Sequence, residues 1–225
     1  MFKKIISLLL VLVALVQAQI GIEYSAGLNS QYFWRGYDLS ESKPVLAPEI
    51  TLNLGETGIW FDVWAAINAD VREIDLTGAY YWELSAATSI DLGMVAYTYP
   101  GLDVDPTYEL FAAVYGTGLP FEPEFLTAYD FTLKTLYFDL AGSQEILSDR
   151  FPLTTSIGLG LYSWDGYSGL SNIRLGVSKA YEVGSLTLTP GLQLNMVPQG
   201  FIDEAASGTS SNEIVLSLIL GAGGE

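Results

Sequence analysis

The stretch Leu153-Thr154-Thr155-Ser156-Ile157-Gly158-Leu159-Gly160-Leu161 decides the fold. Every second position carries a large apolar residue, except that Thr155 takes one of these positions. The residues between them are small or polar. Side chains along a β-strand point alternately to opposite faces of the sheet, so this pattern predicts a strand with one apolar and one polar face. The chain repeats the pattern on both sides of this stretch.

We expect about twelve such strands, separated by turns and loops. In the first of them, the apolar face is expected to carry Ile22, Tyr24, Leu28, Tyr32 and Trp34. The polar face of the strands carries small and charged residues. The expected strands cover residues 20–35, 45–54, 59–67, 72–82, 88–99, 107–115, two segments flanking residue 134, 153–162, 172–178, 185–195 and 213–220.

The composition favours a chain whose apolar faces meet lipid. Hydrophobic residues make up 50% of the 225 residues, charged residues only 16%, and the mean hydropathy is +0.32. After residue 20 no apolar run reaches the roughly 20 residues that a transmembrane helix needs. In hydrocarbon, a chain without such helices satisfies its backbone only as a closed barrel. We therefore predict an all-β, transmembrane, antiparallel up-and-down β-barrel of about 12 strands, with both termini in the periplasm.

The N-terminus has the pattern of a secretory signal peptide. Lys3 and Lys4 form a basic region, residues 5–16 form an apolar run too short to span a bilayer as a helix, and Val16-Gln17-Ala18 offers small residues for cleavage. We expect residues 1–18 to be removed and residues 19–225 to form a single barrel domain. The expected location is the bacterial outer membrane.

Charge and composition exclude several classes of function. The net charge is −17, which argues against nucleic acid as a partner. There is no Cys and no His, so disulfides, thiolate ligands, His-based metal sites and His-dependent catalysis are absent. No catalytic motif is evident. We expect that the protein is not an enzyme and that it binds neither a cofactor nor a metal. The expected partners are outer-membrane lipid and small solutes or cations.

Aromatic residues cluster near the expected strand ends, as in the interfacial girdles of membrane barrels. Residues 198–212 are rich in Ser and Gly and are expected to form a mobile acidic loop. The aromatic clusters are Tyr32-Phe33-Trp34, Tyr80-Tyr81-Trp82, Tyr97 with Tyr99, and Tyr162 with Trp164.

The polar face, turned inward, gives an acidic lumen. Acidic walls attract cations and repel anions, so we predict a passive, cation-preferring pore. An unpaired charge inside a narrow barrel is costly, so we expect Arg35 and Arg174 to lie against carboxylates. The expected lumen residues are Glu23, Arg35, Glu49, Asp62, Glu73, Asp75, Glu109, Asp139 and Arg174.

Several short stretches resemble the TorF family of porins, which are Gram-negative outer-membrane proteins of this length. The resemblance covers most of the chain after the signal peptide, and it implies a β-barrel with a porin role. Outer-membrane barrels often end in an aromatic residue, whereas this chain ends in Gly-Gly-Glu. The stretches are residues 28–36 (LNSQYFWRG), 64–68 (WAAIN), 73–76 (EIDL), 97–101 (YTYPG) and 174–179 (RLGVSK).

Three other interpretations remain open. Twelve strands lie between the filled interiors of about eight strands and the wide channels of sixteen. Inward aromatic residues could therefore close the lumen and leave a structural or surface-interaction protein. An outer-membrane enzyme that uses carboxylates and a soluble periplasmic β protein are the other two. The aromatic residues expected to face inward are Trp60, Trp64, Phe111, Tyr115, Tyr137 and Tyr162.

Overall fold

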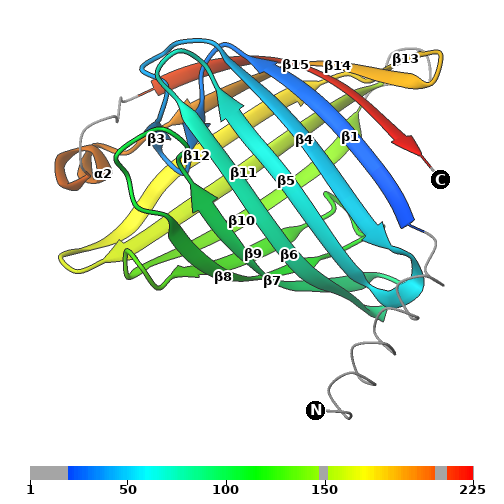
Figure 1. Cartoon of the computed structure of the whole chain (residues 1–225), viewed down its shortest axis with the longest axis horizontal. Helices are drawn as coiled ribbons and strands as arrows, with labels where there is room; N and C mark the ends of the chain where they lie inside the picture. Colours follow the sequence, from blue (N-terminus) through cyan, green and yellow to red (C-terminus); the bar gives the residue numbers. More distant parts are fainter. Residues whose placement is uncertain (1–19, 147–151, 206–211, 225) are drawn as a thin grey trace.

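Twelve antiparallel strands close into a β-barrel in the part of the chain that the structure describes (Figure 1). The structure is a computed structural model, and it describes residues 20–146, 152–205 and 212–224. Each strand pairs with its neighbours in the sequence order, and pairing of β15 with β1 completes the ring. The predicted all-β barrel and its strand count are confirmed.

The ring strands are 7 to 14 residues long. One further strand, β13, pairs only with the end of β14, and β2 and β3 form a separate small hairpin. The ring strands are β1 (Ile20–Asn29), β4 (Val45–Leu54), β5 (Ile59–Ile67), β6 (Arg72–Ser85), β7 (Thr88–Thr98), β8 (Thr107–Tyr115), β9 (Glu124–Asp130), β10 (Thr135–Ile146), β11 (Leu153–Trp164), β12 (Tyr167–Ser178), β14 (Leu186–Met196) and β15 (Asn212–Gly224); the other elements are β2 (Phe33–Trp34), β3 (Tyr37–Asp38), η1 (Gly55–Thr57), β13 (Tyr181–Val183) and α2 (Gln199–Glu204).

The alternation of the sequence sorts the side chains onto the two faces of the barrel. Apolar side chains such as Leu140, Ile157 and Leu216 are half exposed on the outer face. Polar residues between them, such as Asp139 and Asn172, are buried inside. A soluble protein would show the opposite arrangement, whereas a barrel in lipid presents its apolar face outward.

The barrel has two distinct ends. Ile20 and Gly224 lie at one end, because β1 and β15 pair antiparallel with Ile22 opposite Gly224. We call this the terminal end. The opposite end, which we call the loop end, carries residues 30–44 and helix α2 (Figure 1).

The first strand is shorter than predicted. It ends at Asn29, and residues 30–44 turn back into the barrel with the β2–β3 hairpin at their centre. Tyr32 and Trp34 were expected on the outer face, which is wrong, since Tyr32 packs on the inward Trp64 and Trp34 packs on Tyr97. Burial of these rings against other aromatic residues outweighs extension of the strand.

The predicted aromatic girdle is correct only in part. Tyr80 and Trp82 are exposed on the outer surface. Tyr97 and Tyr162, in contrast, are buried inside the barrel, at 6% and 5% exposure. Both belong to the inward row of their strands, so the register of the sheet places them away from lipid.

The segment after β14 contains ordered structure that the sequence did not predict. Residues 199–204 form the short helix α2, and Phe201 is completely buried. The expectation of a loop over residues 198–212 is therefore wrong for residues 199–204, which are helical. Residues 206–211 lie outside the described residues.

The predicted signal peptide, residues 1–18, also lies outside the described residues. Among the residues that are described, no helix combines the length and apolarity needed to cross a bilayer.

Candidate functional site

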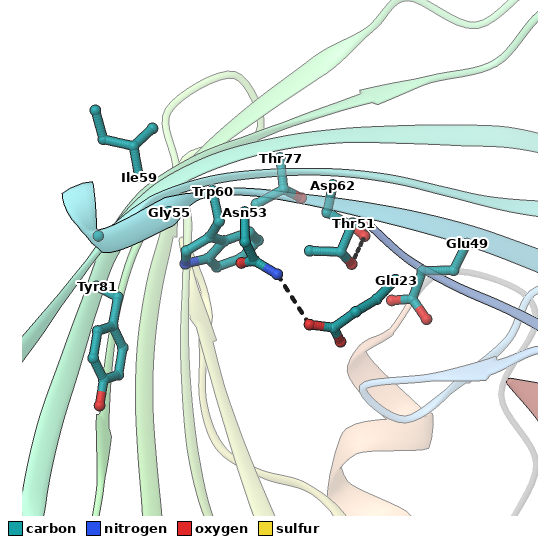
Figure 2. Close-up of a pocket in the computed structure, with 11 residues that line it drawn as sticks. Glu23, Glu49, Thr51, Asn53, Gly55, Ile59, Trp60, Asp62, Thr77 and Tyr81 are labelled. Carbon is teal, nitrogen blue, oxygen red and sulfur yellow. Dashed lines mark hydrogen bonds between the residues drawn. The ribbon is translucent and has the colours of Figure 1, made fainter. Parts of the chain in front are cut away.

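The interior of the barrel contains an open cavity at the terminal end. Its volume is about 590 Å³, and strands β1, β4, β5 and β6 form its walls. Figure 2 shows the side chains of Glu23 and Glu49 directed into one space, with Ile59 pointing away from it. The polar residues of the wall are Glu23, Glu49, Thr51, Asn53, Asp62 and Thr77.

Three carboxylates give this cavity its character, and we call Glu23, Glu49 and Asp62 the acidic wall. Each accepts a hydrogen bond from a neutral side chain, which stabilises the carboxylate without cancelling its charge. The residues that line this cavity include neither Lys nor Arg. The donors are Asn53 Nδ2 to Glu23 Oε1 at 2.9 Å, Ser25 Oγ to Glu49 Oε2 at 2.9 Å, and Thr51 Oγ1 to Asp62 Oδ1 at 2.7 Å.

Two further acids, Glu73 and Asp75, lie on the inward face of β6. Glu73 is buried, and Asp75 pairs in register with Trp64 on one side and Tyr97 on the other. Within the described residues, Asp75 Oδ1 is buried without a hydrogen-bond partner.

The β2–β3 hairpin carries Arg35 into the lumen. Arg35 Nη1 donates to Glu109 Oε2 at 2.6 Å, and Nη2 donates to Glu109 Oε1 at 2.8 Å. Tyr97 Oη donates to the same carboxylate at 3.0 Å. The guanidinium also lies 4.4 Å from the ring centre of Trp34 and 4.2 Å from that of Tyr137. Bidentate pairing and ring stacking are geometries that suit arginine and not lysine.

The environment of Arg35 stabilises the protonated, positively charged form of its side chain. Desolvation by burial acts to lower the pKa of the guanidinium, but the hydrogen bonds and the charge of Glu109 raise that pKa above its ordinary value. Arg35 therefore keeps its positive charge where it faces Glu109.

A second ion pair lies on the barrel wall. Arg174 Nη2 donates to Asp139 Oδ1 at 2.6 Å, and Tyr137 Oη donates to Asp139 Oδ2 at 2.5 Å. Arg174 Nη1 also donates to Tyr137 Oη at 3.3 Å. Tyr137 thus touches both arginines, one through its ring and the other through its hydroxyl. Both arginines lie against carboxylates, as we predicted.

A cluster of aromatic side chains packs around the hairpin at the loop end. Phe201 of α2 packs edge-on against Tyr37, Trp164 and Tyr167, with ring centres 5.2, 5.8 and 5.7 Å away. Burial raises the pKa of Tyr37 to about 12, so its hydroxyl stays protonated. We call Tyr37, Tyr162, Trp164, Tyr167 and Phe201 the loop-end cluster.

The sequence-predicted site residues fall into three groups. Glu23, Glu49 and Asp62 come together at the cavity, and Glu73 and Asp75 lie on the neighbouring strand β6. The remaining four form the two ion pairs, Arg35 with Glu109 and Arg174 with Asp139. Their role in lining a pore stays a prediction.

Sequence reasoning missed the hairpin and the loop-end cluster. The signal for the hairpin is the pair Arg35-Gly36 between aromatic residues, since both residues have positive φ, 49° and 103°. Two-residue hairpin turns demand positive φ, and glycine supplies it without steric cost. The sequence shows no comparable signal for the burial of Phe201.

Comparison with protein families gives one match. Residues 16–146 match the family model Gcw_chp, described as a bacterial protein of unknown function. The match covers more than half of the chain. No curated protein matches the chain.

Solved structures that share this barrel architecture include porins. The KdgM porin superposes with a TM-score of 0.60 at 9% identity, covering 91% of this chain and 99% of that one. A second KdgM structure, in complex with disordered oligogalacturonate, gives 0.57 at 9% identity, covering 91% and 99%. The NanC porin gives 0.57 at 10% identity, covering 89% and 98%. At such identity the likeness establishes a shared porin-like barrel fold.

Proposed function

The chain belongs to the Gcw_chp family of bacterial proteins of unknown function, so its function has to come from its own geometry, and we propose that it is an outer-membrane porin for small solutes, with a preference for cations. The barrel fold shared with KdgM and NanC supports this proposal, as does the resemblance of the sequence to the TorF porins. The apolar outer face of the barrel suits a lipid environment.

The proposal includes an orientation in the membrane. We propose that residues 1–18 are a cleaved signal peptide and that residues 19–225 form the barrel. Short turns in such barrels face the periplasm and longer loops face outward. The terminal end, with the short turns 55–58 and 86–87, is then periplasmic, and the loop end with residues 30–44 faces the cell exterior.

The observation that carries the proposal is the acidic wall. Three carboxylates face one cavity of about 590 Å³ that contains no basic side chain among its lining residues. Such a wall raises the local concentration of cations and repels anions. The oligogalacturonate of the KdgM complex is an anionic saccharide, which an acidic wall would repel.

Planar-bilayer recordings under a KCl gradient test the proposal. We expect a reversal potential of the sign that marks cation preference. The triple variant Glu23→Gln, Glu49→Gln, Asp62→Asn should lower the cation-to-anion permeability ratio by about threefold or more, because it removes the fixed charge while keeping the side-chain size. Anion preference in the unmodified protein would contradict the proposal.

A matched variant removes the same charge elsewhere. Asp103→Asn, Asp105→Asn and Asp165→Asn change three exposed acids at the loop end, away from the acidic wall. We expect this variant to keep most of the cation preference. An equal loss in both triple variants would show that overall charge, and not the acidic wall, sets the selectivity.

A second candidate function is a closed barrel with a structural or surface-interaction role. The inward hairpin and the loop-end cluster favour it, because they place a buried ion pair and five aromatic rings inside the loop end. Swelling of liposomes in small sugars separates the two candidates. Entry of a pentose or smaller solute supports the porin, and exclusion of all of them together with absent ion conductance supports the closed barrel.

A further inference from the structure

The β2–β3 hairpin is bonded to itself along its backbone. Phe33 pairs with Asp38 and Trp34 with Tyr37, and Leu39 N–H donates to Tyr32 O at 2.8 Å. These bonds are internal to the segment, so they survive if the hairpin moves as a unit.

The base of the hairpin is also organised locally. The carboxylate of Asp38 accepts hydrogen bonds from the backbone N–H groups of Ser40 and Ser42 at 3.0 and 2.6 Å. Glu41 and Ser42 have φ values of 52° and 56°, a left-handed conformation that is unusual for non-glycine residues. The chain thus makes a fixed reversal at this base, and the hairpin projects from it into the lumen.

Side chains attach the tip of the hairpin to the barrel wall. The strongest of these attachments is the bidentate Arg35–Glu109 pair, in which the two side chains are 10% and 3% exposed. Trp34 and Tyr32 add ring contacts to Tyr97 and Trp64, with centres 5.8 and 5.3 Å apart. Arg35 itself sits at positive φ in the turn, as a two-residue hairpin turn requires.

We propose that the Arg35–Glu109 pair is a latch that holds the hairpin across the lumen, and that its release widens the passage. This inference rests on the proposed porin function and deepens it by naming the element that sets the pore width. The hairpin is a preformed unit with a fixed base. The Arg35–Glu109 pair is the charged attachment of its tip to the barrel wall, beside the ring contacts of Tyr32, Trp34 and Tyr37. A substitution that breaks this ion pair removes side-chain contacts and leaves the backbone hydrogen bonds of the barrel and the hairpin intact.

Single-channel recordings of Arg35→Ala and Glu109→Gln test the latch. Conductance follows the width of the narrowest section, so we expect a rise of about twofold or more in both variants. Arg72→Ala is the matched control, because Arg72 is an exposed arginine at the same end of the barrel. Heat-modifiable migration on a denaturing gel confirms that each variant has folded before it is recorded.

Trypsin gives a second readout that does not depend on conductance. The bond between Arg35 and Gly36 is a tryptic site. We expect the hairpin to protect it in the unmodified protein, because the Arg35 side chain is 10% exposed and Gly36 is buried. In Glu109→Gln the site is still present, so release of the hairpin should expose it. We expect mass spectrometry to find cleavage after Arg35 in Glu109→Gln and not in the unmodified protein or in Arg72→Ala.

The outcomes separate the latch from the porin. Unchanged conductance in both variants, with Arg35 still protected in Glu109→Gln, overturns the latch while a conducting unmodified protein upholds the porin. Conductance that arises only in the two variants supports the latch and shows that the unmodified barrel is closed. If no variant conducts, the porin proposal fails and the trypsin pattern alone decides the latch.

Discussion

Gly160 of β11 illustrates how single residues shape the lumen. A β-carbon at this position would collide with Asn172 Oδ1 and would lie 2.5 Å from Tyr137 Oη. Asn172 is fully buried, and Tyr137 is held by its hydrogen bond to Asp139. The absence of a side chain at Gly160 therefore makes room for the polar network that joins the two arginines.

The variant Gly160→Ala should destabilise the barrel by about 1–3 kcal/mol, because overpacking forces buried neighbours off their preferred positions. Urea unfolding in lipid vesicles, followed by tryptophan fluorescence, measures the change. Gly21→Ala is the control, since its β-carbon would meet only Asn53 Cβ at 3.6 Å, an ordinary contact. Equal stability of the two variants would show that the network around Asn172 adjusts without cost.

Helix α2 is an element whose position depends on one side chain. It has six residues and no side-chain cap, which is too short for stability on its own. Phe201 is completely buried in the loop-end cluster, and its ring also lies against Gly36 at the tip of the hairpin. Packing of this ring, and not helix propensity, fixes the element against the barrel.

Phe201→Ala should release α2 while the barrel stays folded. Loss of the buried ring costs about 3 kcal/mol, which corresponds to a rise of roughly a hundredfold in the locally opened population. Cleavage by a glutamate-specific protease after Glu204 reports that opening. Gln199→Ala, an exposed change in the same helix, should cleave at nearly the rate of the unmodified protein. Similar rates for both variants would mean that other contacts hold the helix.

At the scale of the whole molecule, the alternation predicts the strands, and the apolar composition without a run long enough for a transmembrane helix predicts that they close into a barrel. The period of two assigns each residue to a face, and an even ring of antiparallel strands brings Ile20 and Gly224 to one end. The same alternation placed Glu23, Glu49 and Asp62 on the inward face, where they meet at one cavity. These features depend on local pattern and on the closure of the sheet.

The contents of the loop end could not be predicted in the same way. Tyr32 and Trp34 continue the alternation of the first strand, so the pattern carries no mark of the point where the chain leaves the sheet. The hairpin is held by Glu109, which is 74 positions from Arg35 in the sequence. Such a contact joins residues far apart in the chain, and a single sequence does not specify which distant side chains meet in the folded barrel.

Adjacent residues on β11 allow a test of which face meets lipid. Ile157 points outward and is half exposed, whereas Ser156 points inward next to Gly176. Arginine on the lipid face near the bilayer midplane costs about 2–4 kcal/mol, and lumen positions tolerate charge. Ile157→Arg should therefore lower the free energy of unfolding in vesicles by about that amount. Ser156→Arg should change the free energy of unfolding by less than about 1 kcal/mol, because an aqueous, acidic lumen accepts the guanidinium. Heat-modifiable migration and urea titration in vesicles measure both variants. A larger loss for Ser156→Arg than for Ile157→Arg would invert the two faces and make the chain a soluble barrel with a packed interior.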